Sequence, residues 1–186
     1  MVYKPAQNWS LYASYGESFQ PQTGTTFDGS AFDPESGEQV EAGIKTALLD
    51  NRLSVTFSLF ELTRENLLTA DPENAGFSVQ TGEQRSRGAE VDIKGEPLPG
   101  WQVTASMGYI DAEVREDDDI EPGNELNNVP ELSGSLWSTY TFNSGRLEGL
   151  GFGGGLFAAG SRQGDLANTF EVDSYVRADL SVFYKL

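Results

Sequence analysis

Two groups of residues in this chain have types and spacing that could support chemistry. Gly149, Gly151 and Gly154 fit the GxGxxG spacing of dinucleotide-binding loops. That motif needs a strand before it and a helix after it, because the helix N-terminus binds the pyrophosphate. Here the glycines open an alternating segment that continues through Leu156 and Ala158. We therefore expect small, inward-facing strand positions and not a nucleotide site.

The second group, Asp117–Asp119, offers the carboxylate oxygens that divalent cations prefer. It lacks the glycine and the distal glutamate of an EF-hand loop, so we interpret it as a solvated loop tip. The chain has no histidine, which excludes a Ser-His-Asp triad within it. It also has no cysteine, which excludes disulfides and thiolate metal sites. We expect neither an enzyme nor a bound cofactor.

Charge narrows the range of partners. The chain holds 12 Lys and Arg against 29 Asp and Glu, a net charge of -17. Nucleic-acid binding needs a basic surface to meet the phosphates, so nucleic acid is excluded as a partner. The same charge balance argues against docking on an anionic leaflet through basic residues. Mean hydropathy is -0.40, and no apolar run approaches the roughly 18 residues of a membrane helix.

Apolar and polar side chains alternate with period two along most of the chain. This period predicts strands with two chemically different faces. A strand crosses a bilayer in about 9–11 tilted residues, half of which face a polar interior, so a membrane barrel can have polar average hydropathy. Eight strands are predicted, at Asn8–Tyr15, Val40–Leu48, Leu53–Leu59, Ala89–Lys94, Trp101–Tyr109, Leu132–Phe142, Leu150–Ala158 and Val172–Lys185.

The connections between these strands alternate in length. Short turns are expected at Asp50-Asn51, Pro97–Gly100 and Ser144-Gly145. Long loops are expected at Pro21–Ser36, Asp71–Asn74, Asp111–Glu125 and Arg162–Asn168. All long loops then lie on one side of an all-β, antiparallel up-and-down meander, as in outer-membrane barrels. A soluble β-sandwich remains the alternative, because its strands show the same alternation.

The aromatic residues favour the membrane interpretation. Amphipathic rings prefer the depth of the lipid headgroups, so a membrane barrel carries one aromatic girdle at each interface. Tyr15 and Tyr109 lie in the outward phase near the long loops. The outward aromatics near the short turns are Trp9, Trp101, Phe142, Phe152 and Tyr184.

Five sequence motifs, in order along the chain, resemble those of TonB-dependent siderophore receptors. The resemblance spans essentially the whole chain, and the order of the motifs makes it specific. The motifs are Tyr12–Phe19, Pro34–Lys45, Glu83–Glu90, Gly123–Trp137, and Gly164-Asp165 with Asn168.

The resemblance implies that residues 1–186 are a fragment of one 22-stranded barrel domain in the bacterial outer membrane, plugged by an N-terminal domain. Such receptors bind a ferric siderophore between loops and plug, and the TonB complex drives import by pulling on the plug. The chain shows no plug and no TonB-contacting segment. Its start, Met1–Pro5, lacks the apolar region of a signal peptide, and it ends at Tyr184–Leu186, before the family's final strands.

Within such a barrel, charged strand positions should face inward, where they can pair across strands or with the plug. Lys or Arg on the lipid face would cost about 2–4 kcal/mol at the midplane. Trp137 is expected inward, against the plug or a neighbouring side chain, and so are the small glycines near Gly151. Arg85 and Arg87 are expected to be solvated or plug-facing, beside a bend or bulge at Gly88. The predicted inward charges are Glu41, Lys45, Glu90, Asp92, Lys94, Arg177 and Asp179.

Closure of the sheet is a separate prediction. Eight strands enclose only enough space for side chains, and crowding opposes burying this many charges. We therefore expect an open arc whose unpaired edges are the strands of Tyr12 and Val176. A stand-alone eight-stranded barrel is disfavoured, because four long loops exceed what an anchor requires. The alternative function is a surface-exposed β adhesion module that binds partners through acidic loops and must hydrate its outward face.

One pair of residues is a candidate for ligand contact. Phe27 and Phe32 lie among Thr, Ser and Gly at the tip of the first long loop. Aromatic rings in such a setting suit stacking on the organic periphery of an iron chelate. We hypothesise that both contribute to siderophore capture.

Overall fold

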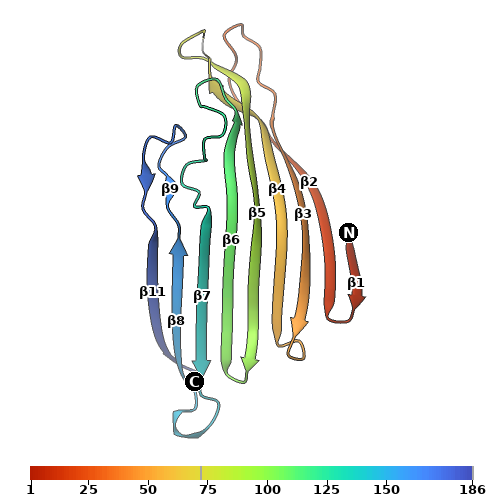
Figure 1. The fold of residues 1–186 in the computed structure, drawn as a ribbon, viewed down its shortest axis with the longest axis vertical. Coiled ribbons are helices and arrows are strands. Elements are labelled where there is room, and N and C mark those ends of the chain that lie inside the picture. The colour runs from red at the N-terminus through yellow and green to blue at the C-terminus, as the bar shows by residue number, and fades with distance from the viewer. Residues whose placement is uncertain (72, 186) are drawn as a thin grey trace.

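The computed structural model describes residues 1–71 and 73–185, and one antiparallel sheet dominates it (Figure 1). Within the described residues the sheet has nine strands in the order β1-β2-β3-β4-β5-β6-β7-β8-β11. A 3-10 turn, η1 (Gly145–Leu147), and a two-stranded β9–β10 hairpin complete the structure. The strands are β1 Val2–Ala6, β2 Trp9–Gln20, β3 Glu35–Leu48, β4 Leu53–Ala70, β5 Ser78–Leu98, β6 Trp101–Glu116, β7 Leu132–Thr141, β8 Leu150–Ala159, β9 Arg162–Gln163, β10 Glu171–Val172 and β11 Tyr175–Tyr184.

The all-β meander is confirmed, with differences at the strand ends. Strands β4, β5 and β6 run well beyond the predicted segments, because their outer parts carry charged residues that break the apolar pattern. Val172 belongs to β10 and not to the last long strand, which begins at Tyr175. Residue 72 of the predicted Asp71–Asn74 exit and the terminal residue 186 lie outside the described residues.

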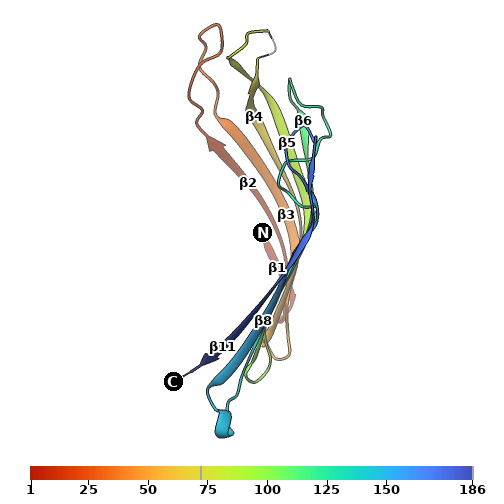
Figure 2. The same cartoon turned by 90° about the vertical axis from the view of Figure 1, so that its left-hand side faces the viewer.

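The sheet is a curved, open arc (Figure 2). Strands β1 and β11 are the two ends of the strand order and do not pair with each other. The prediction of an open arc is confirmed, and the single sheet rules out a sandwich for the described residues. One predicted edge was wrong, because β1 pairs with the first part of β2 through Val2–Tyr12 and Tyr3–Leu11. The strand of Val176 is an edge, as expected.

The strand register separates two faces. Residues paired across an antiparallel ladder share a face, so one row runs Val91, Met107, Gly134, Ala158 and Val176. The predicted apolar set that includes Val55, Phe57, Val103, Leu136, Leu180 and Val182 shares this outward face. Glu90, Asp92, Arg177 and Asp179 lie on the inward face. The predicted division of the faces is confirmed.

The connections lie at the expected ends of the sheet, but their lengths do not all sort as predicted (Figure 1). The β7–β8 connection (residues 142–149), which contains η1, was predicted as a short turn and is longer than the β4–β5 loop at the opposite end. The β3–β4 turn has three residues with positive φ, Leu49, Asp50 and Asn51, at 53°, 56° and 66°. Gly100, with φ 82°, closes the β5–β6 turn at the same end of the sheet. At the opposite end, the long loops join β2 to β3, β4 to β5, β6 to β7 and β8 to β11. No helix in the described part of the chain is long and apolar enough to cross a membrane.

The irregularity expected at Gly88 lies elsewhere. The β4–β5 register shifts between Arg64 and Leu67, where Asn66 adopts φ 59°. Gly88 stays in regular register, and a Cβ there would lie 2.3 Å from the Tyr109 carbonyl oxygen and 2.9 Å from Phe60 Cζ. Its small size therefore permits close approach of a neighbouring strand and a ring, and no bulge is involved.

Candidate functional site

On the inward face of β8, aromatic rings lie over Gly151 of the GxGxxG segment and over Gly155, which follows the segment. A Cβ added to Gly151 would lie 2.3 Å from the Phe183 ring, and one added to Gly155 would lie 2.3 Å from the Trp137 ring. The segment is strand β8, with no helix after it, so the nucleotide site is excluded. Gly151 faces inward as expected, whereas Gly154 pairs with Leu180 and Ser138 and so lies on the outward face. The small inward positions receive the rings of Trp137 and Phe183 from the adjacent strands.

Charged residues concentrate on the inward face of β3 and β5. Glu41 accepts a hydrogen bond from the Tyr12 hydroxyl at 2.6 Å. Lys45, Glu90, Asp92 and Lys94 share this face, as predicted, and their side chains are solvent-exposed in the described structure. Exposed charges of both signs can bind a polar surface that approaches this face of the sheet.

The inward charges of β11 are arranged differently. Arg177 Nε donates a hydrogen bond to Asp179 Oδ2 at 3.0 Å. The Arg177 guanidinium carbon also lies 4.5 Å from the centroid of the Phe157 ring, within cation–π range. The charge of Arg177 is therefore balanced by neighbouring side chains of the sheet.

Arg85 and Arg87 do not face the inside of the arc, and this corrects the plug-facing expectation. Both pair in register with outward residues of β6, Glu113 and Asp111. Arg85 forms an ion pair with Glu113, and Arg87 Nη2 lies 2.8 Å from Asp111 Oδ2. Arg87 Nε also donates a hydrogen bond to Asp111 Oδ2 at 2.9 Å, and the Arg87 side chain is half exposed to solvent.

The first loop pair comprises the β2–β3 loop (residues 21–34) and the β4–β5 loop (residues 71–77). The Gln80 side-chain amide on β5 binds Asp33 twice, accepting from its N–H at 2.7 Å and donating to its carbonyl at 2.6 Å. Phe27 meets Phe77 edge-to-face, with the ring centroids 5.2 Å apart. Phe32 packs within its own loop, where its Cε2 atom would lie 3.3 Å from a Cβ on Gly24.

The structure therefore separates the two candidate phenylalanines. The Phe27 ring is 59% exposed and lines an open cavity of about 320 Å³ with Asp28, Asp71 and Val79. Phe32 lines the interior of its loop. Sequence reasoning missed Gln80 and Phe77, which hold this loop pair together, because their partners lie more than forty residues away in the sequence and no local pattern marks them.

The second loop pair comprises the β6–β7 loop (residues 117–131) and the β8–β11 connection (residues 160–174). Asn168 accepts from the Glu125 N–H and donates to the Glu125 carbonyl, each at 2.9 Å. Asn124 Nδ2 donates to the Leu166 carbonyl at 3.0 Å, and the Asn128 N–H donates to the Gln163 carbonyl at 2.8 Å. Two of the five sequence motifs thus meet in space.

Carboxylates stabilise turns within the second loop pair by accepting hydrogen bonds from nearby residues. The Thr169 hydroxyl and N–H hold the pKa of Asp165 below its ordinary value. Asp117 Oδ1 accepts from the N–H groups of Asp119 and Ile120, which gives the predicted acidic tip a role in its own turn. Among residues 1–71 and 73–185, no cluster of three acidic residues is placed to hold a metal ion.

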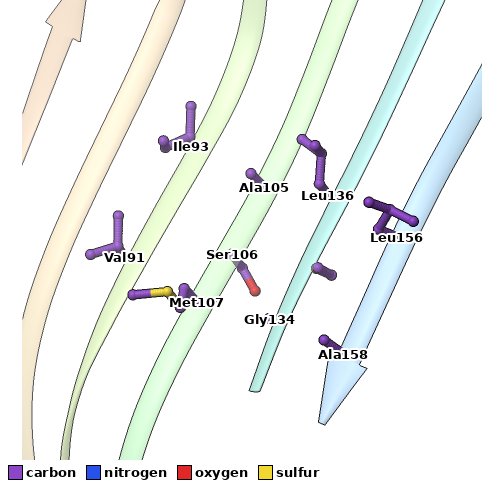
Figure 3. Close-up of a pocket in the computed structure, with 10 residues that line it drawn as sticks. Val91, Ile93, Ala105, Ser106, Met107, Gly134, Leu136, Leu156 and Ala158 are labelled. Atoms are coloured by element: carbon purple, nitrogen blue, oxygen red, sulfur yellow. The ribbon is translucent and has the colours of Figure 1, made fainter. Parts of the chain in front are cut away.

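An apolar groove lies on the outward face and not among the loops (Figure 3). It holds about 360 Å³, and its lining residues come from β5, β6, β7 and β8. The side chains of Met107, Leu136 and Leu156 stand around the small positions Ala105, Gly134 and Ala158.

The family follows from a match over the whole length of the sheet. Residues 1–186 match the model of the TonB dependent receptor-like β-barrel. The chain belongs to the TonB-dependent receptor family. It is 40% identical over 187 residues to the metal-pseudopaline receptor CntO of Pseudomonas aeruginosa, covering 100% of this chain and 26% of that protein. It is 42% identical over 175 residues to the ferrichrome outer membrane transporter/phage receptor of Escherichia coli K12, covering 94% of this chain and 23% of that protein.

Solved structures of TonB-dependent receptors share the fold. The siderophore receptor PiuA of Acinetobacter baumannii matches with a TM-score of 0.85 and 29% identity, over 100% of this chain and 28% of that one. The P. aeruginosa receptor FpvA, in a complex with a heterologous ferric pyoverdine, matches with a TM-score of 0.83 and 28% identity, over 98% of this chain and 26% of that one. The chain spans about a quarter of the length of these relatives.

Proposed function

We propose that this chain is a wall segment of a bacterial outer-membrane receptor that binds ferric siderophores and imports them in a TonB-dependent manner. The observation that carries the proposal is the family match over residues 1–186, including relatives described as siderophore receptors. The polarity of the sheet supports it. Between the rows of Trp101 and Tyr109, the outward positions of β5–β8 carry no charged residue.

The same outward face argues against the surface adhesion module. An adhesin must hydrate both sides of its sheet, whereas here large apolar side chains such as Leu136, Leu156 and Leu180 are exposed on one side. Hydrocarbon is the environment that accepts this surface, because every strand inside the sheet has its backbone groups paired. The receptor acts as a transporter and not as an enzyme, and the ferric siderophore is its cargo.

The polar inward face supports the partner assignment. Exposed Lys45, Glu90, Asp92 and Lys94 would contact the plug domain of the intact receptor, and the TonB complex would act through that plug. Phe27 and Phe32 would contribute to siderophore capture from the first loop pair, with Phe27 meeting the ligand and Phe32 supporting the loop.

Uptake of radioactive ferric siderophores by cells tests the proposal. The full-length receptor is expressed in cells without other siderophore receptors, with and without TonB. We expect saturable iron uptake from at least one siderophore in the presence of TonB, and binding without uptake in its absence. The isolated chain, an open arc with no enclosed cavity, should not bind the siderophore tightly. Absence of binding to a panel of hydroxamate, catecholate and mixed chelates would overturn the proposal.

A further inference from the structure

The open cavity of the first loop pair combines an aromatic wall with two carboxylates. It holds about 320 Å³, and Phe27, Asp28, Asp71 and Val79 are among its lining residues. The Phe27 ring is largely exposed and meets Phe77 edge-to-face. The first loop pair extends farther beyond the sheet than the second loop pair does (Figures 1 and 2). A ligand that approaches the long-loop end therefore meets this cavity early.

Donors from the same loops hold both carboxylates in their ionised form. Asp28 Oδ1 accepts hydrogen bonds from the Thr26 hydroxyl and, at 3.1 Å, from the Ser30 N–H. Asp71 accepts from the side-chain amide and the N–H of Asn74, at 3.1 Å and 2.9 Å. These bonds hold the pKa of each carboxyl below its ordinary value of 3.8, so both are charged at neutral pH. A carboxylate has about four acceptor sites, so each can still accept from a ligand.

No basic residue of the first loop pair offsets this charge. Residues 21–34 and 71–77 contain no Lys or Arg. With the adjoining strand ends included, residues 17–35 and 64–83 carry a net charge of -7. Arg64, their one basic residue, already pairs with Glu35 at 2.7 Å. The acidic residues of these two segments are Glu17, Asp28, Asp33, Glu35, Glu65, Asp71, Glu73 and Glu83.

The lining of the cavity suits an organic cation better than a metal ion. A divalent cation needs about six or more oxygen ligands. Among residues 1–71 and 73–185, no cluster of three acidic residues is placed to hold such an ion. An alkylammonium group has an apolar stem that can pack on a ring such as Phe27. Its charge is attracted both by the face of an aromatic ring and by carboxylates.

We propose that this cavity binds an ammonium group at the end of an alkyl chain, and that the preferred ferric chelate carries such a free amine. The alkyl stem packs on Phe27, and the ammonium is attracted by Asp28 and Asp71. Anionic chelates, such as ferric tris-catecholates, are repelled at this loop pair. The inference rests on the proposed function and names the chemical class of its ligand.

Equilibrium titration of the full-length receptor with two matched pairs of ferric trihydroxamates tests this inference. One pair is ferric desferrioxamine B, which keeps a free terminal amine, and its N-acetyl derivative. The other is a cyclic trihydroxamate hexapeptide with one lysine side chain, either free or acetylated. In each pair that binds, we expect the free amine to bind about ten-fold more tightly than the amide. High salt should reduce this preference, because the loop charges are exposed to solvent.

Variants of the cavity separate charge recognition from loop structure. Asp28→Asn and Asp71→Asn keep an acceptor oxygen, and each should reduce the preference for the free amine about three-fold. Neither should change the affinity for the N-acetyl form, whereas damage to the loop would weaken both forms. Phe27→Leu removes the ring but keeps apolar volume, and it should also reduce the preference. Asp165→Asn is the matched control, because Asp165 accepts in the same way from Thr169 but lies in the second loop pair.

The outcomes distinguish this inference from the proposed function. Equal binding of the free and acetylated forms, or the same loss of preference in Asp165→Asn, would overturn the inference. Binding of a ferric tris-catecholate without binding of either trihydroxamate would overturn it as well, but it would leave the proposed function intact. Absence of binding to all of these chelates would overturn both.

Discussion

The two loop pairs at the long-loop end use the same device in different settings. In each, one side-chain amide binds both the N–H and the carbonyl of a residue on the neighbouring loop, Gln80 with Asp33 and Asn168 with Glu125. Gln80 extends from a strand, and its loops also meet through the exposed Phe27–Phe77 contact. Asn168 sits in a loop at φ 52°, within a network of further backbone bonds.

This difference indicates that the second loop pair is rigid and that the first can adapt its conformation. The second loop pair continues the sheet, because Val114 and Ala112 pair with Asn124 and Leu126 through backbone hydrogen bonds. Val114 is 1% exposed, so this pair is built on the best-buried apolar position in the described structure. The first loop pair presents exposed aromatic surface and fewer backbone bonds between its loops. We therefore expect the second pair to form a fixed rim and the first to adjust to ligand.

Removal of the Asn168 amide should have the largest effect. Asn168→Ala leaves the N–H and the carbonyl of Glu125 without their partner, which costs about 2 kcal/mol. Hydrogen exchange of the Glu125 amide in the full-length receptor should then be about 30-fold faster. Gln163→Ala is the control, because Gln163 contacts Asn128 through its backbone carbonyl. Equal acceleration in both variants would contradict the central role of Asn168.

Removal of the Gln80 amide should have a smaller effect. Asp33 is exposed, so water replaces part of what Gln80→Ala removes, and the cost is about 1 kcal/mol. Exchange of the Asp33 amide should be about five-fold faster, and the second loop pair should keep its protection. Loss of protection in both pairs would show that the rim behaves as one unit.

The aromatic surface of the first loop pair should affect ligand affinity more than loop stability. Phe27→Ala should weaken binding of the ferric siderophore a few-fold, since aromatic contacts contribute about 0.5–1.5 kcal/mol. Phe32→Ala should act indirectly, with a smaller loss. Equilibrium titration of the full-length receptor measures both. An unchanged affinity in the double variant would leave residues 21–34 as a plain exposed loop.

Lowering the pH should have the smallest effect of these changes. The effect on loop protection should be similar in the two loop pairs. Hydrogen bonds from Thr26 and Thr169 hold the pKa values of Asp28 and Asp165 below their ordinary value of 3.8. A lowered pKa stabilises the folded loop fully above the ordinary value, and the contribution is lost as the pH falls through the lowered value. Loop protection, corrected for intrinsic exchange, should be constant from pH 7 to about 5 and decrease below about 4. Asp165→Asn should remove the decrease around residues 165–169.

Much of the fold could be predicted from local pattern, whereas the candidate site could be predicted only in part. Alternation placed Val91 and Met107 on one face and Glu90 and Asp92 on the other, because side-chain direction in a strand depends only on the parity of sequence position. The same pattern failed for the outer parts of β4 to β6. Arg85 and Arg87 follow the strand parity there, but their charge suggested an inward position.

The sequence by itself determined the two faces of the sheet, the end that bears the long loops, and the acidic character of that end. Each of these follows from residue order over a few positions, or from composition. Only the tertiary structure decided which side chains meet: Trp137 over Gly155, Arg87 beside Asp111, Gln80 on Asp33 and Asn168 on Glu125. These contacts depend on the register between strands and on the path of loops, which long-range pairing sets cooperatively and no local pattern records.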